Sequence, residues 1–256
     1  MGTPVRAAGA WAAAMAVLIV PCLLAGCASG QEKQGEATGT SDVAALVDCA
    51  DDVQGSEASV SAPAPEGLRD ALEQAAGAYA GTYAVACASA DGSWSVDVNG
   101  DKPFVSASII KLAILGTLLD QAQSGVLSLD DSATVGPSDI VGGTGVIQAS
   151  GAGGSYTYRQ LAAYMIQDSD NTATNLIIDA VGMPAVSEYA SEIGLTQTVL
   201  NRRMMDFAAG DENYTSANDV AHILQLVYQG KLVSSDASEF ALDLLKGQHD
   251  DAGLLE

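Results

Sequence analysis

Apolar positions along the chain recur at two spacings, one typical of strands and one typical of helices. Residues 66–79 are expected to form a helix, and alternating apolar residues on both sides of Asp91-Gly92 predict a β-hairpin, because this dipeptide favours a tight turn. The alternating residues are Tyr83, Val85, Cys87, Trp94, Val96 and Val98. A later run over residues 109–123 is apolar on nearly all sides, so this helix is expected in the interior of the domain.

Capping residues and glycines divide the rest of the chain into further helices. Thr157 and Gln160 have the spacing of a capping box before a helix that runs to Ile166. Other helices are expected over residues 172–181, 184–194, 220–228 and 236–246. A hairpin, many helices and further strands still to be placed predict an α+β fold for the domain at residues 66–256.

Residues 1–27 are expected to be a lipoprotein signal peptide. An apolar run over residues 11–24 follows Arg6, and it is shorter than the roughly 20 residues that a membrane-spanning helix needs. The run ends in Leu-Ala-Gly-Cys27, which resembles the bacterial lipobox, in which the cysteine receives diacylglycerol. The alternative is an ordinary signal peptide that leaves Cys27 as a thiol. Lipid attachment would anchor the protein to the cell membrane, outside the cytoplasm.

Residues 28–65 lack a sustained apolar period and are rich in Gly, Ser, Ala, Glu and Asp, which predicts a flexible acidic linker. Cys49 lies in this segment and Cys87 in the predicted hairpin. Outside the cytoplasm such a pair often forms a disulfide, and two buried thiols are the alternative. The sequence leaves both open, because it does not give the distance between the two Cα atoms.

The charge balance excludes some classes of function. The 256 residues include 10 Lys and Arg against 32 Asp and Glu, a net charge of −22, which would repel nucleic acid. The two histidines, His222 and His249, lie far apart, without cysteines or carboxylates at metal-ligand spacing. We therefore expect no metal or other cofactor, no nucleic-acid partner, and a monomer that acts on a small molecule.

Ser108 and Lys111 are candidates for nucleophilic chemistry. A serine three residues before a lysine shares a face of a helix with it, so the amine can approach the hydroxyl and remove its proton. Burial would lower the pKa of the lysine and favour this role. The alternative is a helix-capping serine and a solvated lysine. The apolar neighbours of Lys111 argue against that alternative.

Ser169-Asp170-Asn171 lies between two predicted helices, where polar groups can project into a cleft. Taken alone, the triplet is a plausible helix cap. The order of the two motifs changes this interpretation. Ser-Ile-Ile-Lys111, followed by Ser-Asp-Asn171 and by Thr-Ala-Thr-Asn175, resembles class A β-lactamases and other penicillin-recognising serine enzymes. The Gly-Gly-Thr-Gly stretch at residues 142–145 also resembles a glycine stretch of that family.

This resemblance implies a fold and a set of roles. The fold would be an antiparallel sheet flanked by a helical subdomain. Ser108 would be the nucleophile, Lys111 the base, Ser169 the proton relay and Asn171 a substrate-binding residue, with β-lactams or D-alanyl peptides as substrates. The third family motif, a Lys-Thr-Gly strand, does not occur before Glu256. We therefore expect a piece of a longer protein, from which the C-terminal strands are missing.

The chain departs from the family at the residue that activates the deacylating water. The family places a glutamate two residues beyond an arginine, with an asparagine four residues further on. Here these positions fall on Met204 and Ala208, and counting from the next arginine gives Met205. Asp206 is more plausibly a structural carboxylate than a substitute. A slow β-lactamase is expected, with a D-alanyl peptidase or penicillin-binding protein, or a non-catalytic lipoprotein that binds peptidoglycan, as alternatives.

Overall fold

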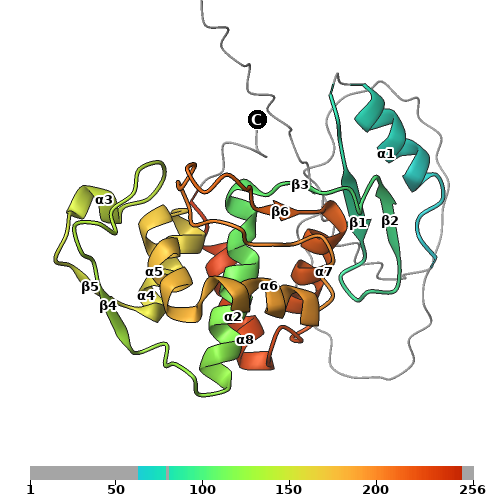
Figure 1. Cartoon of the computed structure of the whole chain (residues 1–256). Coiled ribbons are helices and arrows are strands. Elements are labelled where there is room, and N and C mark those ends of the chain that lie inside the picture. Colours follow the sequence, from blue (N-terminus) through green and yellow to red (C-terminus); the bar gives the residue numbers. More distant parts are fainter. Residues whose placement is uncertain (1–62, 79–80, 250–256) are drawn as a thin grey trace, which may run out of the picture.

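The computed structural model describes residues 63–78 and 81–249, and within them it has the predicted α+β class (Figure 1). The helices in chain order are α1 (Leu68–Gly77), α2 (Lys111–Gln123), α3 (Ile147–Ser150), α4 (Tyr158–Gln167), α5 (Asn171–Val181), α6 (Met183–Glu192), α7 (Ala217–Tyr228) and α8 (Ser235–Lys246). The strands are β1 (Val85–Ala88), β2 (Ser95–Val98), β3 (Phe104–Val105), β4 (Ser132–Thr134), β5 (Ser155–Thr157) and β6 (Tyr214–Thr215).

Helix α2 lies at the centre of the helical part of the fold, in contact with α4, α5 and α6 (Figure 1). Its side chains are apolar around nearly the whole circumference, which explains why it is buried on most sides. Ile114 and Leu118 are completely buried, and the core extends from them into the surrounding helices. Gly116 lets α6 approach, since a Cβ there would overlap the ring of Tyr189. The predicted interior position of this helix is therefore confirmed.

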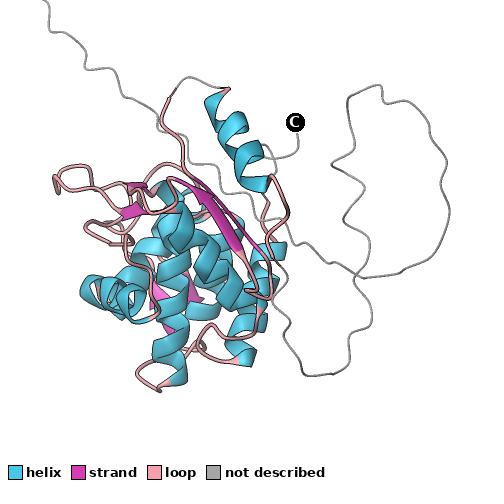
Figure 2. Cartoon of the chain, turned by 90° about the vertical axis from the view of Figure 1, so that its right-hand side faces the viewer, coloured by secondary structure: helices cyan, strands magenta, loops and turns pink. Residues whose placement is uncertain are grey.

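The predicted hairpin forms at one side of the helices. Strands β1 and β2 are antiparallel, with Val85 opposite Val98, and Gly92 in the turn has a φ of +77°. Helix α7 packs against β1 and α1 packs against β2, so the two strands lie between helices (Figure 2). Small residues such as Ala84 and Ala221 make the contact between the hairpin and α7 close.

Most predicted helix boundaries lie close to the observed ones, because local capping fixes them, but α1 is shorter than the predicted 66–79 and α7 begins at Ala217 rather than at residue 220. Thr157 and Gln160 form the expected capping box at the start of α4. Ser216 caps α7 by accepting the N–H of Asp219. The run over residues 109–123 differs in one respect. It opens with a 3₁₀ turn, η2 (Ala107–Ile110), before α2 begins.

The described strands do not form one continuous sheet. They form three antiparallel pairs, β1 with β2, β3 with β6 and β4 with β5. Within the same residues, no helix is long and apolar enough to cross a membrane. The predicted signal peptide with Cys27, and the linker with Cys49, lie outside the described residues. Cys87 is buried in β1, and its pairing with Cys49 stays a prediction.

Candidate active site

Ser108 lies in the turn η2, where the chain passes from strand β3 into α2. Pairing of β3 with β6, together with a 2.8 Å hydrogen bond from the Ser106 N–H to the carbonyl of Asn213, fixes the backbone before this turn. Ala107 has a φ of +45°, a left-handed conformation that is uncommon for residues other than glycine. The turn leaves the Ser108 side chain exposed, so a ligand can reach its hydroxyl.

Lys111 begins α2, and its side chain is only 3% exposed. Its Nζ donates hydrogen bonds to three oxygens: the carbonyl of Ser169 at 2.7 Å, Oγ of Ser169 at 2.9 Å and Oδ1 of Asn171 at 3.0 Å. Nζ also lies 3.3 Å from Oγ of Ser108. Burial lowers the pKa of Lys111 from 10.5 to about 8, and the Asp170 carboxylate opposes this shift. The alternative of a solvated lysine is therefore wrong.

Ser169 lies between the Lys111 amine and the Ser108 hydroxyl and contacts both. Its hydroxyl donates to Oγ of Ser108 at 3.0 Å while accepting a hydrogen bond from Lys111. The residue has a φ of +50°, and such conformations persist where the surrounding structure holds them, often at functional sites. The amine and the two hydroxyls thus form a closed set of contacts between α2 and the segment joining α4 to α5.

Asp170 holds this segment in place and has no contact with the two hydroxyls. One carboxylate oxygen accepts the N–H of Ala173 at 2.8 Å and caps α5. The other accepts the N–H groups of Val146 at 2.7 Å and Ile147 at 2.8 Å. The side chain is 1% exposed, so its charge is compensated by these donors. The cap interpretation of the triplet is correct for Asp170, and it leaves Ser169 and Asn171 available to contact Lys111.

The glycine stretch at residues 142–145 lies directly beside the triplet. The side-chain amide of Asn171 donates to the carbonyl of Gly142 at 3.1 Å, and its N–H donates to the carbonyl of Thr144 at 3.2 Å. Gly143 has a φ of +90°, and a Cβ on it would lie 2.6 Å from Nδ2 of Asn171. A side chain at position 143 would therefore displace Asn171. The Thr144 hydroxyl, which sequence reasoning did not single out, donates to the Ser169 carbonyl at 2.7 Å.

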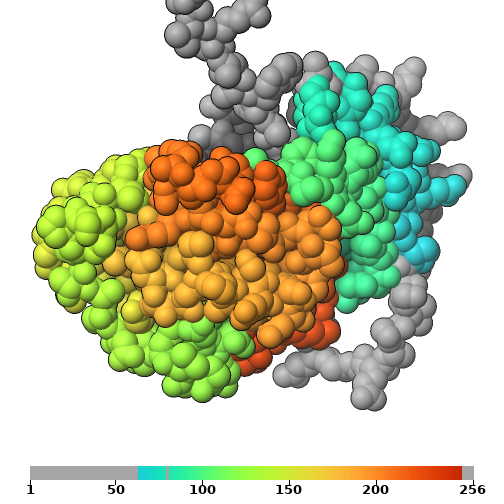
Figure 3. Space-filling view, in the orientation of Figure 1, coloured from blue at the N-terminus to red at the C-terminus, as the bar shows by residue number. Residues whose placement is uncertain are grey.

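The segment over residues 200–213 covers the site from another side, and Figure 3 shows it in orange on the surface between the yellow-green and green parts of the chain. Both amide atoms of Asn175 bind the backbone of Met204, with Oδ1 accepting its N–H at 2.8 Å and Nδ2 donating to its carbonyl at 3.1 Å. The Met204 side chain is 8% exposed and belongs to the core. Met205 faces the glycine stretch, with its Sδ 3.3 Å from the place of a Cβ on Gly143.

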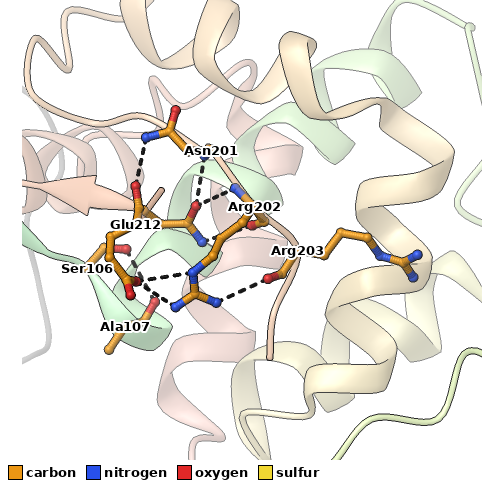
Figure 4. Close-up of polar contacts among 7 residues, drawn as sticks. Ser106, Ala107, Asn201, Arg202, Arg203 and Glu212 are labelled. Carbon is orange, nitrogen blue, oxygen red and sulfur yellow. Dashed lines mark hydrogen bonds and ion pairs between the residues drawn. The ribbon is translucent and has the colours of Figure 1, made fainter. Parts of the chain in front are cut away.

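Two ion pairs fix this segment. Arg202 pairs with Glu212 at 2.6 Å and lies beside Ser106 and Ala107, while the Arg203 side chain extends in the opposite direction (Figure 4). Arg203 pairs with Asp179 of α5 at 2.9 Å. Both guanidinium groups are therefore engaged by carboxylates of the protein itself. Asp206 is exposed in the same segment.

The histidines take no part in the site. Nε2 of His222 contacts the carbonyl of Ile193 at 2.9 Å, and Nδ1 of His249 pairs with Asp168 at 3.0 Å. In the part of the chain that the structure describes, no group of three or more histidines, cysteines or carboxylates is arranged to hold a metal ion.

Comparison with known proteins assigns the family. The sequence profile of the beta-lactamase enzyme family matches residues 66–256, so the chain belongs to this family. A beta-lactamase of Rhodobacter capsulatus is 32% identical over 149 residues, which are 56% of this chain and 50% of that protein. The chain spans about half the length of the curated relatives that it matches.

Solved structures agree with this assignment. A beta-lactamase from Sphaerobacter thermophilus is 30% identical with a TM-score of 0.64, covering 71% of this chain and 69% of that one. The protein PBP-A is 27% identical with the same TM-score, and the coverage is 74% and 71%. A mutant of PBP-A was solved as an acyl-enzyme complex with penicillin G. The fold is thus that of β-lactamases and related penicillin-binding proteins.

Proposed function

We propose that this protein is a serine hydrolase that reacts with β-lactams through an acyl-enzyme on Ser108. The observation that carries the proposal is the position of the Lys111 amine, which is buried and within reach of the hydroxyls of both Ser108 and Ser169. An amine with a pKa of about 8 is partly neutral near pH 7, so it can accept a proton from a serine.

The proposed reaction uses these groups in sequence. Lys111 takes the proton of the Ser108 hydroxyl, and Oγ attacks the carbonyl carbon of the lactam. The N–H of Ser108 is one donor to the oxyanion that forms. The lactam C–N bond then breaks, Ser169 gives its proton to the nitrogen, and Lys111 returns a proton to Ser169. All atoms of the β-lactam stay on the enzyme as an ester.

Release of this ester is proposed to be slow. Hydrolysis requires a base that activates water, and the position where the family has its glutamate is taken by the buried side chain of Met204. A thioether cannot remove a proton from water. The absence of this glutamate also supports a second candidate function, a D-alanyl peptidase or penicillin-binding protein. The similarity of the fold to PBP-A supports the same candidate.

A turnover assay with excess penicillin separates these functions. A slow β-lactamase gives a burst of ring opening equal to the enzyme concentration, followed by a slow steady phase, and Ser108→Ala abolishes both. A penicillin-binding protein gives the burst with almost no steady phase and releases D-alanine from a D-alanyl-D-alanine peptide. A lipoprotein that only binds peptidoglycan gives no burst, and this result would reject the proposal.

We also propose that the protein is lipid-anchored through Cys27 on the outer side of the cell membrane. The proposal rests on the lipobox-like residues before Cys27 in the sequence. Metabolic labelling with an alkyne fatty acid tests it. Labelled protein in the membrane fraction is expected for the natural sequence, and neither label nor membrane fractionation for Cys27→Ala.

A further inference from the structure

The backbone carbonyl of Ser169 accepts two hydrogen bonds from different parts of the chain. One comes from Nζ of Lys111 and the other from Oγ1 of Thr144, and both are 2.7 Å long. The carbonyl oxygen has two lone pairs, so both donors fit. They nevertheless draw on the electron density of the same atom, and each therefore weakens the bond that the other makes.

The Thr144 hydroxyl is not needed to hold its own loop. The carbonyl of Thr144 already accepts the N–H of Asn171 at 3.2 Å. On either side, Gly142 is bound by the Asn171 side chain and Val146 by the Asp170 carboxylate. Thr144 is an exposed residue, so its hydroxyl could have bonded to water at no cost to the loop. Its contact with the Ser169 carbonyl therefore calls for a role other than anchoring.

We propose that Thr144 is a positioning residue for acylation: its hydroxyl competes with the Lys111 amine for the Ser169 carbonyl and so favours the uncharged amine. This inference rests on the proposed function of Ser108 and Lys111. A carbonyl that binds an ammonium group stabilises the charged form, which cannot accept a proton. Sharing this carbonyl with Thr144 reduces that stabilisation.

Some of the other influences on Lys111 favour its charged form and others favour its uncharged form. Burial disfavours the charged amine, and the Asp170 carboxylate favours it. Asp168, which precedes Ser169, is paired with His249. Oδ1 of Asn171 and Oγ of Ser169 also accept hydrogen bonds from the amine. The Thr144 hydroxyl bonds to the Ser169 carbonyl and to none of these other groups. Replacing the Thr144 hydroxyl therefore changes only one of the interactions around Lys111.

A direct titration of the lysine tests the proposal. The full chain would be labelled with [13Cε]lysine, and the Lys111 resonance identified among the five lysines of the sequence by its loss in Lys111→Arg. We expect the titration midpoint of Lys111 in Thr144→Val to rise by about half a pH unit or more above that of the natural protein. At pH values below the midpoint, the acylation rate should fall by about threefold, because half a pH unit reduces the fraction of uncharged amine by that factor. Thr144→Ser, which keeps the hydroxyl, should restore both.

The outcomes separate the alternatives. Ser150→Ala removes a neighbouring hydroxyl that bonds to the Val146 carbonyl instead, and it should leave the midpoint unchanged. An unchanged or lower midpoint in Thr144→Val would overturn the proposal, and so would a slower reaction at every pH with the same midpoint. Thr144→Ala gives the same test if the valine variant does not fold. If penicillin reacts with no variant, the proposed function fails, while the lysine titration still decides the role of Thr144.

Discussion

The side-chain amide of Asn175 binds both the N–H and the carbonyl of Met204, and it thereby fixes the backbone of a residue 29 positions later in the chain. Asn175 is 1% exposed and lies on α5, close after the Ser169-Asp170-Asn171 segment. The contact therefore fixes the backbone of Met204 relative to α5, which begins directly after Ser169 and Asp170. A side chain with different chemistry at position 204 would keep the same backbone anchor.

Met204→Glu is therefore expected to accelerate release of the acyl group. A carboxylate at this position supplies a base for water, and general-base catalysis contributes about 10²–10⁴-fold in rate. The decay of the penicillin adduct, followed by intact mass, measures the effect. Met204→Gln, which has nearly the same shape but no base, is the matched control. Equal decay in both variants would show that position 204 does not face the ester.

Asn175→Ala is expected to lower the free energy of unfolding by about 2–4 kcal/mol, because it leaves a buried N–H and a buried carbonyl of Met204 without partners. Asn201→Ala is the control in the same segment. Its side chain is exposed and donates only to the Glu212 carbonyl, so the loss should be below about 1 kcal/mol. Urea unfolding measures both, and equal losses would contradict the anchoring role of Asn175.

Gly143→Ala and Gly142→Ala should differ strongly. An alanine at 143 would need a φ of +90° and would press on the Asn171 amide, whereas nothing lies within 4 Å of a Cβ at 142. Displacing Asn171 should slow acylation by about tenfold or more, since small misplacements in a site are costly. Gly142→Ala should acylate like the natural protein. The second-order rate constant with penicillin measures this. Equal rate constants for Gly143→Ala and Gly142→Ala would show that the position of Asn171 does not matter for acylation.

Burial of Lys111 should also cost stability in a pH-dependent way. Its pKa is about 8 in the folded protein and near 10.5 in the unfolded chain, so the unfolded state binds more protons between these values. The cost is complete below pH 8 and is relieved as the pH rises towards 10.5. Lys111→Met should therefore be more stable at neutral pH, by about 1–3 kcal/mol.

The difference in unfolding free energy between Lys111→Met and the natural protein isolates this effect from other titrating groups. It should shrink as the pH rises through the interval from 8 to 10.5. A difference that stays constant across that interval would mean that Lys111 has an ordinary pKa in the folded protein.

Much of the fold could be predicted because its determinants are local. Helix α4 begins at the capping box of Thr157, and the hairpin turns at Asp91-Gly92, as the residue pattern indicates. The pairing of distant strands cannot be predicted in this way, since β3 pairs with β6 across more than a hundred residues through only two residues each. The sequence does not predict the turn η2 either, because no local residue pattern distinguishes it from a first turn of α2.

The same distinction applies to the site. Ser108, Lys111, Ser169 and Asn171 were candidates from the sequence, and the structure brings them into contact. Thr144 gave no signal beyond its place in a glycine-rich stretch. Its contact with Ser169 spans 25 residues, and Ser169 itself has a φ of +50°; neither feature can be inferred from the spacing of residue types.

The most direct test of the account is the intact mass of the full-length protein before and after penicillin, with the adduct located by peptide mapping. The account predicts a mass gain equal to one penicillin per chain, located on Ser108 and absent from both Ser108→Ala and Lys111→Ala. A gain located on another residue, or no gain on the natural protein, would contradict the central claim that Lys111 activates Ser108 for acyl transfer.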